Sequence, residues 1–388
     1  MLKMKPLLEG GTVKIPLDIE NQLRQELEKY IAIHTYYYYW KEVAKLAYFN
    51  YDYYIYHNYA LYHPRRKSDV LQNNKTGWAK NEYQPTRECW ERYIKPFALE
   101  FDRAFVKYFP KIIKMIDGRV SLKFLQTVSL DFIDDELMKY EKSVHIYTVD
   151  LDKYFPVITK VKDNKLKQIN IELIIQDPSA PGALKRIVNG KDTTPSLGGW
   201  ASTTSKDKES VISPLIINIS PKKLEKVVDI NYNNVCSEDE YRFYKFNERG
   251  INFSLMKTNY VQLVHDEFGT LAHELTHIFQ VDKFGTTKGL TSGDYNAMDV
   301  DSPEYLKAHT LDTHEYKANI QSIVHSYLDM GFNDIGDFEN FIEYNYLMKV
   351  YKENNIKLWK RAVRDIVNTL NKEYGIKITK DSYDINGF

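Results

Sequence analysis

Two histidines, with a glutamate directly after the first, stand in a segment whose other side chains are uncharged. His273, Glu274 and His277 lie in the proline-free stretch from Thr270 to Phe279. On an α-helix, with about 3.6 residues per turn, the two histidines lie one turn apart on one face, so both imidazoles can bind the same metal ion. We expect Zn2+, because it accepts neutral imidazole nitrogen and a catalytic zinc keeps one coordination position for water.

Glu274 makes hydrolysis the expected chemistry. Zinc lowers the pKa of a bound water toward about 7. A carboxylate within hydrogen-bond reach can take the proton while the water attacks a carbonyl carbon, and can then pass it to the leaving amine. The sequence therefore predicts peptide hydrolysis with Glu274 as general base. The alternative is a pair of ordinary core histidines, but burying such groups in an apolar helix is unfavourable unless they have partners.

This segment resembles the metal-binding helix of the zincin metallopeptidases, whose HExxH motif is also flanked by uncharged positions. The branches of that family differ in the third ligand. Metzincins have glycine and histidine where this chain has Gln280 and Lys283, and the aspartate-ligand branch has aspartate where this chain has Lys288. The resemblance therefore indicates the gluzincin branch, in which a glutamate on a later helix is the third ligand.

The resemblance implies that Glu315 is this third ligand. Glu315 begins the sequence Glu-Tyr-Lys-Ala-Asn, which matches the Glu-x-x-Ala-Asn pattern of gluzincins. Asn319, one turn later, could accept a hydrogen bond from a ligand histidine. The alternative is that Glu315 is an ordinary solvated carboxylate. The other candidate ligands within reach by sequence are Glu304, His309, Asp312, His314 and His325.

The resemblance implies two further features of the site. One is an edge strand above the metal helix that pairs with an extended substrate. We assign it to Val211–Ile219, because Pro214 cannot donate a ladder hydrogen bond and so favours a sheet edge. The other is a transition-state electrophile, usually tyrosine or histidine. The sequence leaves it open among Tyr295, Tyr305, Tyr316 and His309.

The N-terminal third of the chain is predicted to be helical. Apolar residues recur at helical spacing from Asp18 to about Tyr48 and from Thr86 to Met115, with interruptions at Pro96 and Pro110. The chain has 31 tyrosines, many of them in the run Tyr36–Tyr39 and in the segment Tyr51–Tyr62. A/T-rich codons explain this composition better than the second interpretation, an aromatic surface that binds a partner.

Strand patterns begin after residue 118. Alternating runs predict strands over Val144–Val149 and Ile169–Ile175, and Val211–Ile219 is the next strand. Many Gly, Pro, Ser and Thr residues predict a long loop from Asp177 to Ser210. Helical patterns dominate afterwards, and we expect helices over Asn259–Phe284, Thr313–Met330, Asp337–Tyr351 and Asn355–Tyr374.

These elements predict an α+β protein. We expect a mostly helical, tyrosine-rich region over residues 1–117 and a zincin-like metallopeptidase domain over residues 118–388. The second would contain a mixed sheet, with its edge strand over the HExxH helix, followed by C-terminal helices. The resemblance itself covers only about Val211 to Leu328.

Composition bears on partners and location. The 53 basic and 53 acidic side chains leave no net charge, so nothing indicates nucleic-acid binding. We find no signal peptide and no apolar stretch near the roughly 20 residues that cross a bilayer, so we expect no membrane span. Cys89 and Cys236 match no metal-site or disulfide spacing. We expect a cytoplasmic location, which a phage-encoded or released protein would also fit.

Three functions remain open at this point. The first is a zinc peptidase acting on a protein or peptide. The second is a zincin-like structural or binding protein, for example a phage or assembly component, with a non-peptidase metal site. The third is metal-dependent hydrolysis of another substrate. Because a structural zinc site uses four protein ligands and needs no general base, the presence of Glu274 favours the first.

Overall fold

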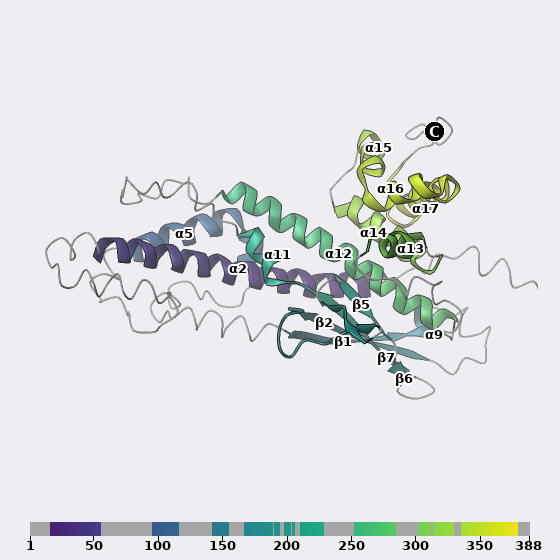
Figure 1. The fold of residues 1–388 in the computed structure, drawn as a ribbon, viewed down its shortest axis with the longest axis horizontal. Coiled ribbons are helices and arrows are strands. Elements are labelled where there is room, and N and C mark those ends of the chain that lie inside the picture. The colour runs from purple at the N-terminus through teal and green to yellow at the C-terminus, as the bar shows by residue number, and fades with distance from the viewer. Residues whose placement is uncertain are drawn as a thin grey trace, which may run out of the picture. The chain divides into compact units, whose positions relative to one another are not determined.

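The described chain, a computed structural model, has strands in its middle part and helices before and after them (Figure 1). Its two longest helices are α2 (Leu17–Ile55) and α12 (Phe253–Phe284). They confirm the helix predicted from Asp18 and the helix predicted around the metal motif. The structure describes residues 16–55, 95–115, 142–154, 167–188, 190–194, 198–202, 204–205, 210–228, 252–284, 302–311, 313–329 and 335–378.

The described residues fall into two compact units. The first takes its residues from Met1–Leu27, Ser143–Ile219 and Val264–Phe388, and the second from Glu28–Lys142 and Ser220–Leu263. Each unit thus combines segments that are distant in sequence, and α2 and α12 contribute residues to both. The division of the chain into residues 1–117 and 118–388 stays a prediction.

The first unit contains a five-stranded sheet with the order β1-β2-β7-β5, in which β6 also pairs with β7. β2 and β7 are parallel, and β5 and β6 run antiparallel to β7. The mixed sheet and the many helices are compatible with the predicted α+β class, and the first two predicted strands are confirmed. The strands are β1 (Lys142–Asp150), β2 (Gln168–Gln176), β5 (Gly199–Ala201), β6 (Thr204–Ser205) and β7 (Ser210–Asn218).

The prediction that Val211–Ile219 is an edge strand is wrong. β7 lies inside the sheet, with β2 on one side and β5 and β6 on the other. Pro214 is tolerated there because its carbonyl accepts a hydrogen bond from the amide of Ser202, in the gap between β5 and β6. A residue's N–H and C=O point to the same edge of a strand, so the missing donor falls in this interruption and leaves the pairing with β2 intact.

The segment from Asp177 to Ser210 was predicted as one long loop, but it contains the short strands β3 (Ile187–Val188), β4 (Lys191–Asp192), β5 and β6. Two buried amides hold it at the ends of β2 and β7. Gln176 donates to the carbonyl of Leu184 (3.0 Å) and accepts from its amide (2.8 Å), and Asn218 donates to the carbonyl of Thr194 (3.4 Å). These side-chain hydrogen bonds satisfy backbone groups of the segment that have no partner in a regular strand ladder.

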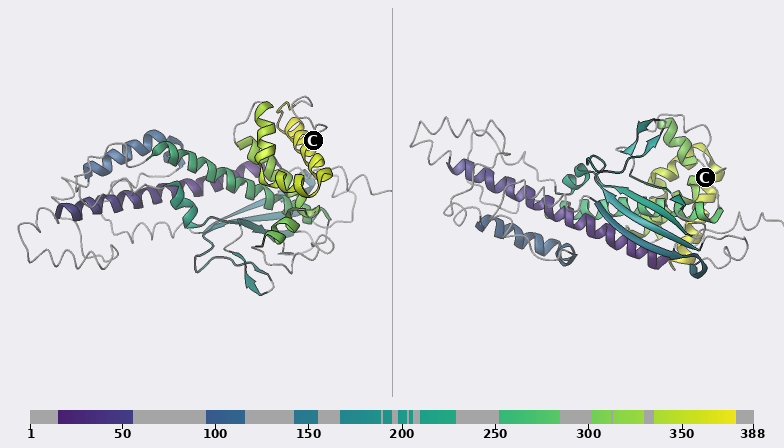
Figure 2. Two further views of the ribbon diagram at one scale, coloured as in Figure 1. Left: turned by 45° about the horizontal axis from the view of Figure 1, so that its top comes forward. Right: turned by 90° about the horizontal axis from the view of Figure 1, so that it is seen from below.

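Helices cover one face of the sheet (Figure 2). Alternate residues of β2, such as Ile171 and Leu173, are fully buried. An added Cβ on Gly199 of β5 would lie 2.9 Å from Thr270 Cγ2 of α12, so the outermost strand on that side lies directly against α12. On the opposite edge, Glu26 of α2 forms an ion pair with His145 of β1 at 3.1 Å.

The C-terminal helices form their own apolar core, which includes Tyr327, Phe338 and Trp359. The helix predicted over Asp337–Tyr351 is two helices, because the side chain of Asn345 accepts a hydrogen bond from the amide of Met348 and caps a new helix there. An additional helix, α13, lies between the helices predicted over Asn259–Phe284 and Thr313–Met330, in a segment whose Gly, Ser, Thr and Asp residues favour a connector. The helices are α13 (Pro303–Leu311), α14 (Thr313–Asp329), α15 (Ile335–Tyr344), α16 (Tyr346–Asn354) and α17 (Ile356–Glu373), and the short helix α9 (Leu151–Tyr154) follows β1.

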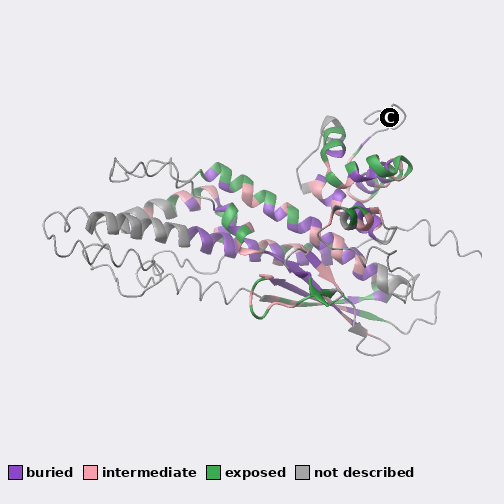
Figure 3. Cartoon of the chain, in the orientation of Figure 1, coloured by how far each residue is buried: buried purple, intermediate pink, exposed green. Residues whose placement is uncertain are grey.

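The second unit has an aromatic core. Figure 3 shows a buried stretch along α2, and the side chains of Tyr36–Tyr39 and of Trp40 belong to the buried residues of this helix. The ring centroids of Tyr36 and Tyr39 lie 5.5 and 4.4 Å from that of Phe105. This tyrosine run therefore packs internally, so a partner-binding surface at Tyr36–Tyr39 is wrong, and the side chains of residues 51–62 lie outside the described part. The other helices of this unit are α5 (Lys95–Tyr108), α6 (Pro110–Met115) and α11 (Pro221–Val227), with α5 and α6 separated at Pro110 as predicted.

None of the described helices combines the length and the apolar character that a membrane span requires. Residues 63–84, whose polar composition predicts a loop or exposed connector, lie outside the described residues.

Candidate metal centre

The two histidines of the motif lie on one face of α12, as their spacing predicts. Leu275 and Ile278, on the other side of the helix, are buried in the first unit with 0% and 1% exposure. The side chains of His273 and His277 keep 17% and 14% of their surface exposed. The motif therefore lies at the boundary between the core and solvent rather than fully inside the core.

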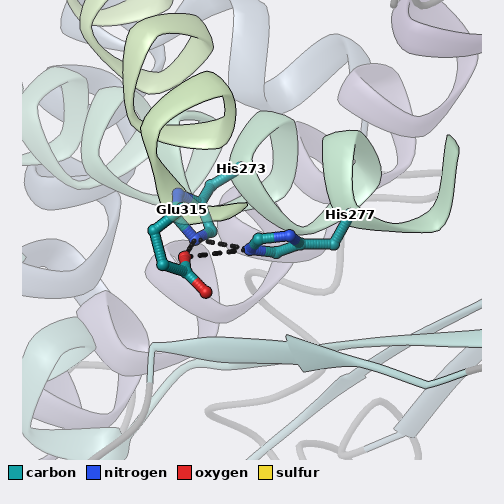
Figure 4. Close-up of side chains that lie close together, drawn as sticks. All are labelled: His273, His277 and Glu315. Carbon is teal, nitrogen blue, oxygen red and sulfur yellow. Dashed lines mark hydrogen bonds and ion pairs between the residues drawn. The ribbon is translucent and has the colours of Figure 1, made fainter. Parts of the chain in front are cut away.

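Glu315 of α14 meets both histidines (Figure 4). Its Oε2 atom lies 3.1 Å from Nε2 of His273 and 3.1 Å from Nε2 of His277, and the two Nε2 atoms lie 3.0 Å apart. Among the described residues, these three form the group of His, Cys, Asp or Glu side chains that could hold a metal ion. The structure thus brings together all three predicted ligands.

The carboxylate of Glu315 is buried and held in its charged form. Burial alone would raise its pKa, but the hydrogen bonds from His273 and His277, with the electrostatic attraction of His277 and His309, outweigh burial and lower the pKa below its usual range. A carboxylate that stays ionised is the form that binds a metal cation.

Asn319 holds α14 in place beside the candidate metal centre. Its amide nitrogen donates to the carbonyl of Thr310 in α13 (3.3 Å) and to the hydroxyl of Tyr351 in α16 (3.1 Å). Both bonds fix the helix turn that follows Glu315. The predicted bond, in which Asn319 accepts from a ligand histidine, is not tested by these two bonds and stays a prediction.

His309 of α13 lies on the other oxygen of Glu315, with its Nε2 atom 3.4 Å from Oε1. Burial lowers its pKa, and this effect exceeds the opposing effect of the Glu315 charge. The half-buried Glu274 lies near enough for its charge to raise the pKa of His309. His309 therefore belongs to the immediate surroundings of the three ligands.

The other candidate ligands and electrophiles either lie apart from the three proposed ligands or have side chains that the structure does not describe. His325 is buried and forms an ion pair with Glu20 (3.4 Å), and Glu304 is exposed on α13. The hydroxyl of Tyr316 donates to Asp365 in α17 (2.8 Å), so this tyrosine faces the C-terminal core. The residues whose side chains lie outside the described part are Tyr295, Tyr305, Asp312 and His314.

The sequence did not indicate that β5 is the strand beside the metal helix. An added Cβ on Gly199 would lie 2.8 Å from the carbonyl oxygen of Ile216 and 2.9 Å from Cγ2 of Thr270, so only glycine fits. Thr270 precedes His273 by about one helical turn. The pair Gly198 and Gly199 was the available signal, since glycine in a strand often marks a close approach of another backbone or element.

Comparisons with protein-family models, with curated proteins and with solved structures found no match to this chain. The site itself offers two imidazole nitrogens and one ionised carboxylate oxygen that converge on one point, with a second carboxylate, Glu274, next to them on α12.

Proposed function

We propose that the chain is a zinc-dependent peptidase of the gluzincin type. The observation that carries the proposal is the convergence of His273 Nε2, His277 Nε2 and Glu315 Oε2, with separations of 3.0 and 3.1 Å. Glu315 comes from a different helix, so the convergence is not a consequence of helical spacing alone.

The donor set suits zinc. Tetrahedral zinc with ligands at roughly 2.0–2.1 Å keeps neighbouring ligand atoms about 3.3 Å apart, which is close to the spacing of these three atoms. Two imidazoles and one carboxylate are the ligand set of catalytic zinc sites in peptidases, which leave the fourth position to water. The partial exposure of both histidines is consistent with such an open position.

Each residue then has a defined task. His273, His277 and Glu315 hold the ion, which supplies Lewis acidity toward a water molecule and a carbonyl group when it is bound. Glu274 accepts the proton of the attacking water and returns it to the leaving amine. His309 is the described candidate electrophile nearest the ligands, and a neutral imidazole N–H there can donate a hydrogen bond to the carbonyl oxygen as it gains negative charge.

The substrate would bind along β5 rather than along Val211–Ile219. The amide of Asn218 donates to the carbonyl of Gly198, and the amide of Ser202 donates to that of Pro214. Backbone groups of successive residues point to opposite edges of a strand, so those of Gly199 and Ala201 point away from β7. An extended peptide can bond to them by strand addition, about one helical turn from His273.

A structural metal site is the second candidate function, and His309 is the observation that favours it. If His309 swings onto the ion, the site has four protein ligands and no place for water. The variant His309→Ala separates the two functions. A structural site loses zinc affinity and stability, whereas a peptidase keeps its zinc and loses mainly kcat.

The direct test of the proposed function is zinc content together with peptide hydrolysis. The purified full chain, supplied with zinc and dialysed, should contain about one zinc per chain. It should cleave unfolded protein or a peptide mixture, lose this activity to a chelator and regain it when zinc is returned. Wild-type protein that binds no zinc under these conditions would overturn the proposal.

A further inference from the structure

Trp200, the middle residue of β5, points away from the metal helix. The neighbouring Gly199 faces α12, since a Cβ built on it would meet Thr270. Successive side chains of a strand point to opposite faces, so Trp200 points to the other face, whereas Ala201 returns to the face of α12. The two positions that face the metal helix thus hold the smallest side chains, and the opposite position holds the largest.

Trp200 is the outermost member of an apolar row that crosses the sheet. It pairs with Ile216 of β7, and Ile216 pairs with Ile174 of β2. Directly paired residues present their side chains on the same face. Ile216 and Ile174 have 0% and 2% exposure, but Trp200 is partly exposed. The two inner residues of the row are therefore buried, whereas Trp200, at the edge of the sheet, is partly exposed.

The exposed part of the Trp200 side chain is apolar. Its single polar atom, Nε1, is buried, so carbon atoms make up the side-chain surface that the indole presents. A strand added to β5 would lie about 4.8 Å away, and its residue opposite Trp200 would extend the row by one side chain.

We propose that Trp200 is a specificity-determining residue that selects a large apolar side chain, such as Phe, Leu or Ile, at one position of an extended peptide bound along β5. The substrate residues before and after that position point to the face of α12, where the flanking β5 residues, Gly199 and Ala201, present no large side chain that could select among them. The selection therefore concerns one position, and its two neighbours are tolerant. This inference rests on the proposed peptidase function and names the substrate class of that same site.

Peptide libraries with one varied position at a time provide the test. We expect wild-type kcat/KM to be about fivefold higher for Phe or Leu than for Ser or Asn at one position, which corresponds to about 1 kcal/mol. Trp200→Ala should reduce this ratio to below about twofold, and Trp200→Phe should restore most of it. Tyr346→Ala, which removes an exposed ring on α16, is the matched control and should leave the ratio unchanged.

A binding measurement separates this inference from the catalytic proposal. In Glu274→Gln, the affinity for the same peptides is measured by fluorescence polarisation, with and without Trp200→Ala. Apolar preference in binding that Trp200→Ala abolishes supports the inference, even if no peptide is cleaved. Cleavage without preference at any position, or a preference that Trp200→Ala leaves intact, overturns the inference and leaves the peptidase standing. Zinc-loaded protein that neither cleaves nor binds any peptide overturns both.

Discussion

Nε2 of His277 and Oε2 of Glu315 lie 3.1 Å apart, although 38 positions of sequence separate the two residues. The contact joins α12 to α14 and completes a group of three ligand atoms. Substitution of Glu315, which removes this contact, therefore tests the proposed zinc site directly.

Glu274→Gln should keep zinc and lose activity. The amide is nearly isosteric with the carboxylate but cannot accept the proton of the attacking water, and general-base catalysis typically contributes about 10²–10⁴-fold. Elemental analysis should find about one zinc per chain, while kcat falls by that factor. Undiminished kcat in this variant would rule out Glu274 as the base and leave the metal site intact.

Glu315→Ala should lose zinc affinity by more than about 100-fold, because even partners of the ligands change affinity by about 10–100-fold and Glu315 supplies a ligand atom itself. Competition with a chromophoric chelator measures this affinity. Glu304→Ala removes an exposed carboxylate from α13 and serves as the control. Equal affinities of the two variants would exclude Glu315 as a ligand.

Asn319→Ala should weaken zinc binding indirectly. It removes the hydrogen bonds to Thr310 and Tyr351, which hold the turn after Glu315. We expect a loss of about 10-fold in zinc affinity and about 1–3 kcal/mol in the free energy of unfolding. Tyr351→Phe removes only the hydroxyl and should cost less in both measurements. The role of Asn319 would be rejected if its removal changed neither quantity.

Gly199→Ala should destabilise the protein by about 1–3 kcal/mol, because the added methyl group would meet the carbonyl oxygen of Ile216 at 2.8 Å and Thr270 Cγ2 at 2.9 Å. Gly182→Ala is the matched control, since nothing lies within 4 Å of its added Cβ. Urea unfolding of both variants measures the difference. If β5 did not lie against α12, the two substitutions would have similar effects.

Acid should weaken the metal-free protein through Glu315. Its pKa in the folded state is lowered, so its contribution to stability is present above the unfolded value of about 4.5 and is lost as pH falls below it. The free energy of unfolding of chelator-treated wild type, minus that of Glu315→Gln, should decrease between pH 7 and pH 3. A difference that is constant over this range would show that the carboxylate is not held ionised by the histidines.

The candidate metal-binding motif and most helices could be predicted from the sequence because their determinants are local. The spacing of His273 and His277 places them on one helical face, and apolar periodicity marked α2, α12 and α17. The break at Asn345 was missed, since a cap is decided by one side-chain hydrogen bond that apolar periodicity does not reveal.

The sheet shows what the tertiary structure alone decided. Pro214 removes a ladder donor, and from the sequence this favours an edge strand. The backbone nitrogen of Pro214 can face either a paired residue of the next strand or an interruption between two strands. Which of the two it faces depends on the distant segment that carries Ser202. The short strand β5 has almost no pattern of its own, and its place beside α12 follows from the contact between Gly199 and Thr270.

By itself, the sequence predicted the helix that carries His273, Glu274 and His277, because helical spacing is a local property, and the family resemblance added Glu315 as the third candidate ligand. The tertiary structure decided that Glu315 reaches both histidines, that His309 lies next to it and that β5 is the strand beside the motif. These depend on contacts between segments far apart in the chain, whose packing no local pattern encodes.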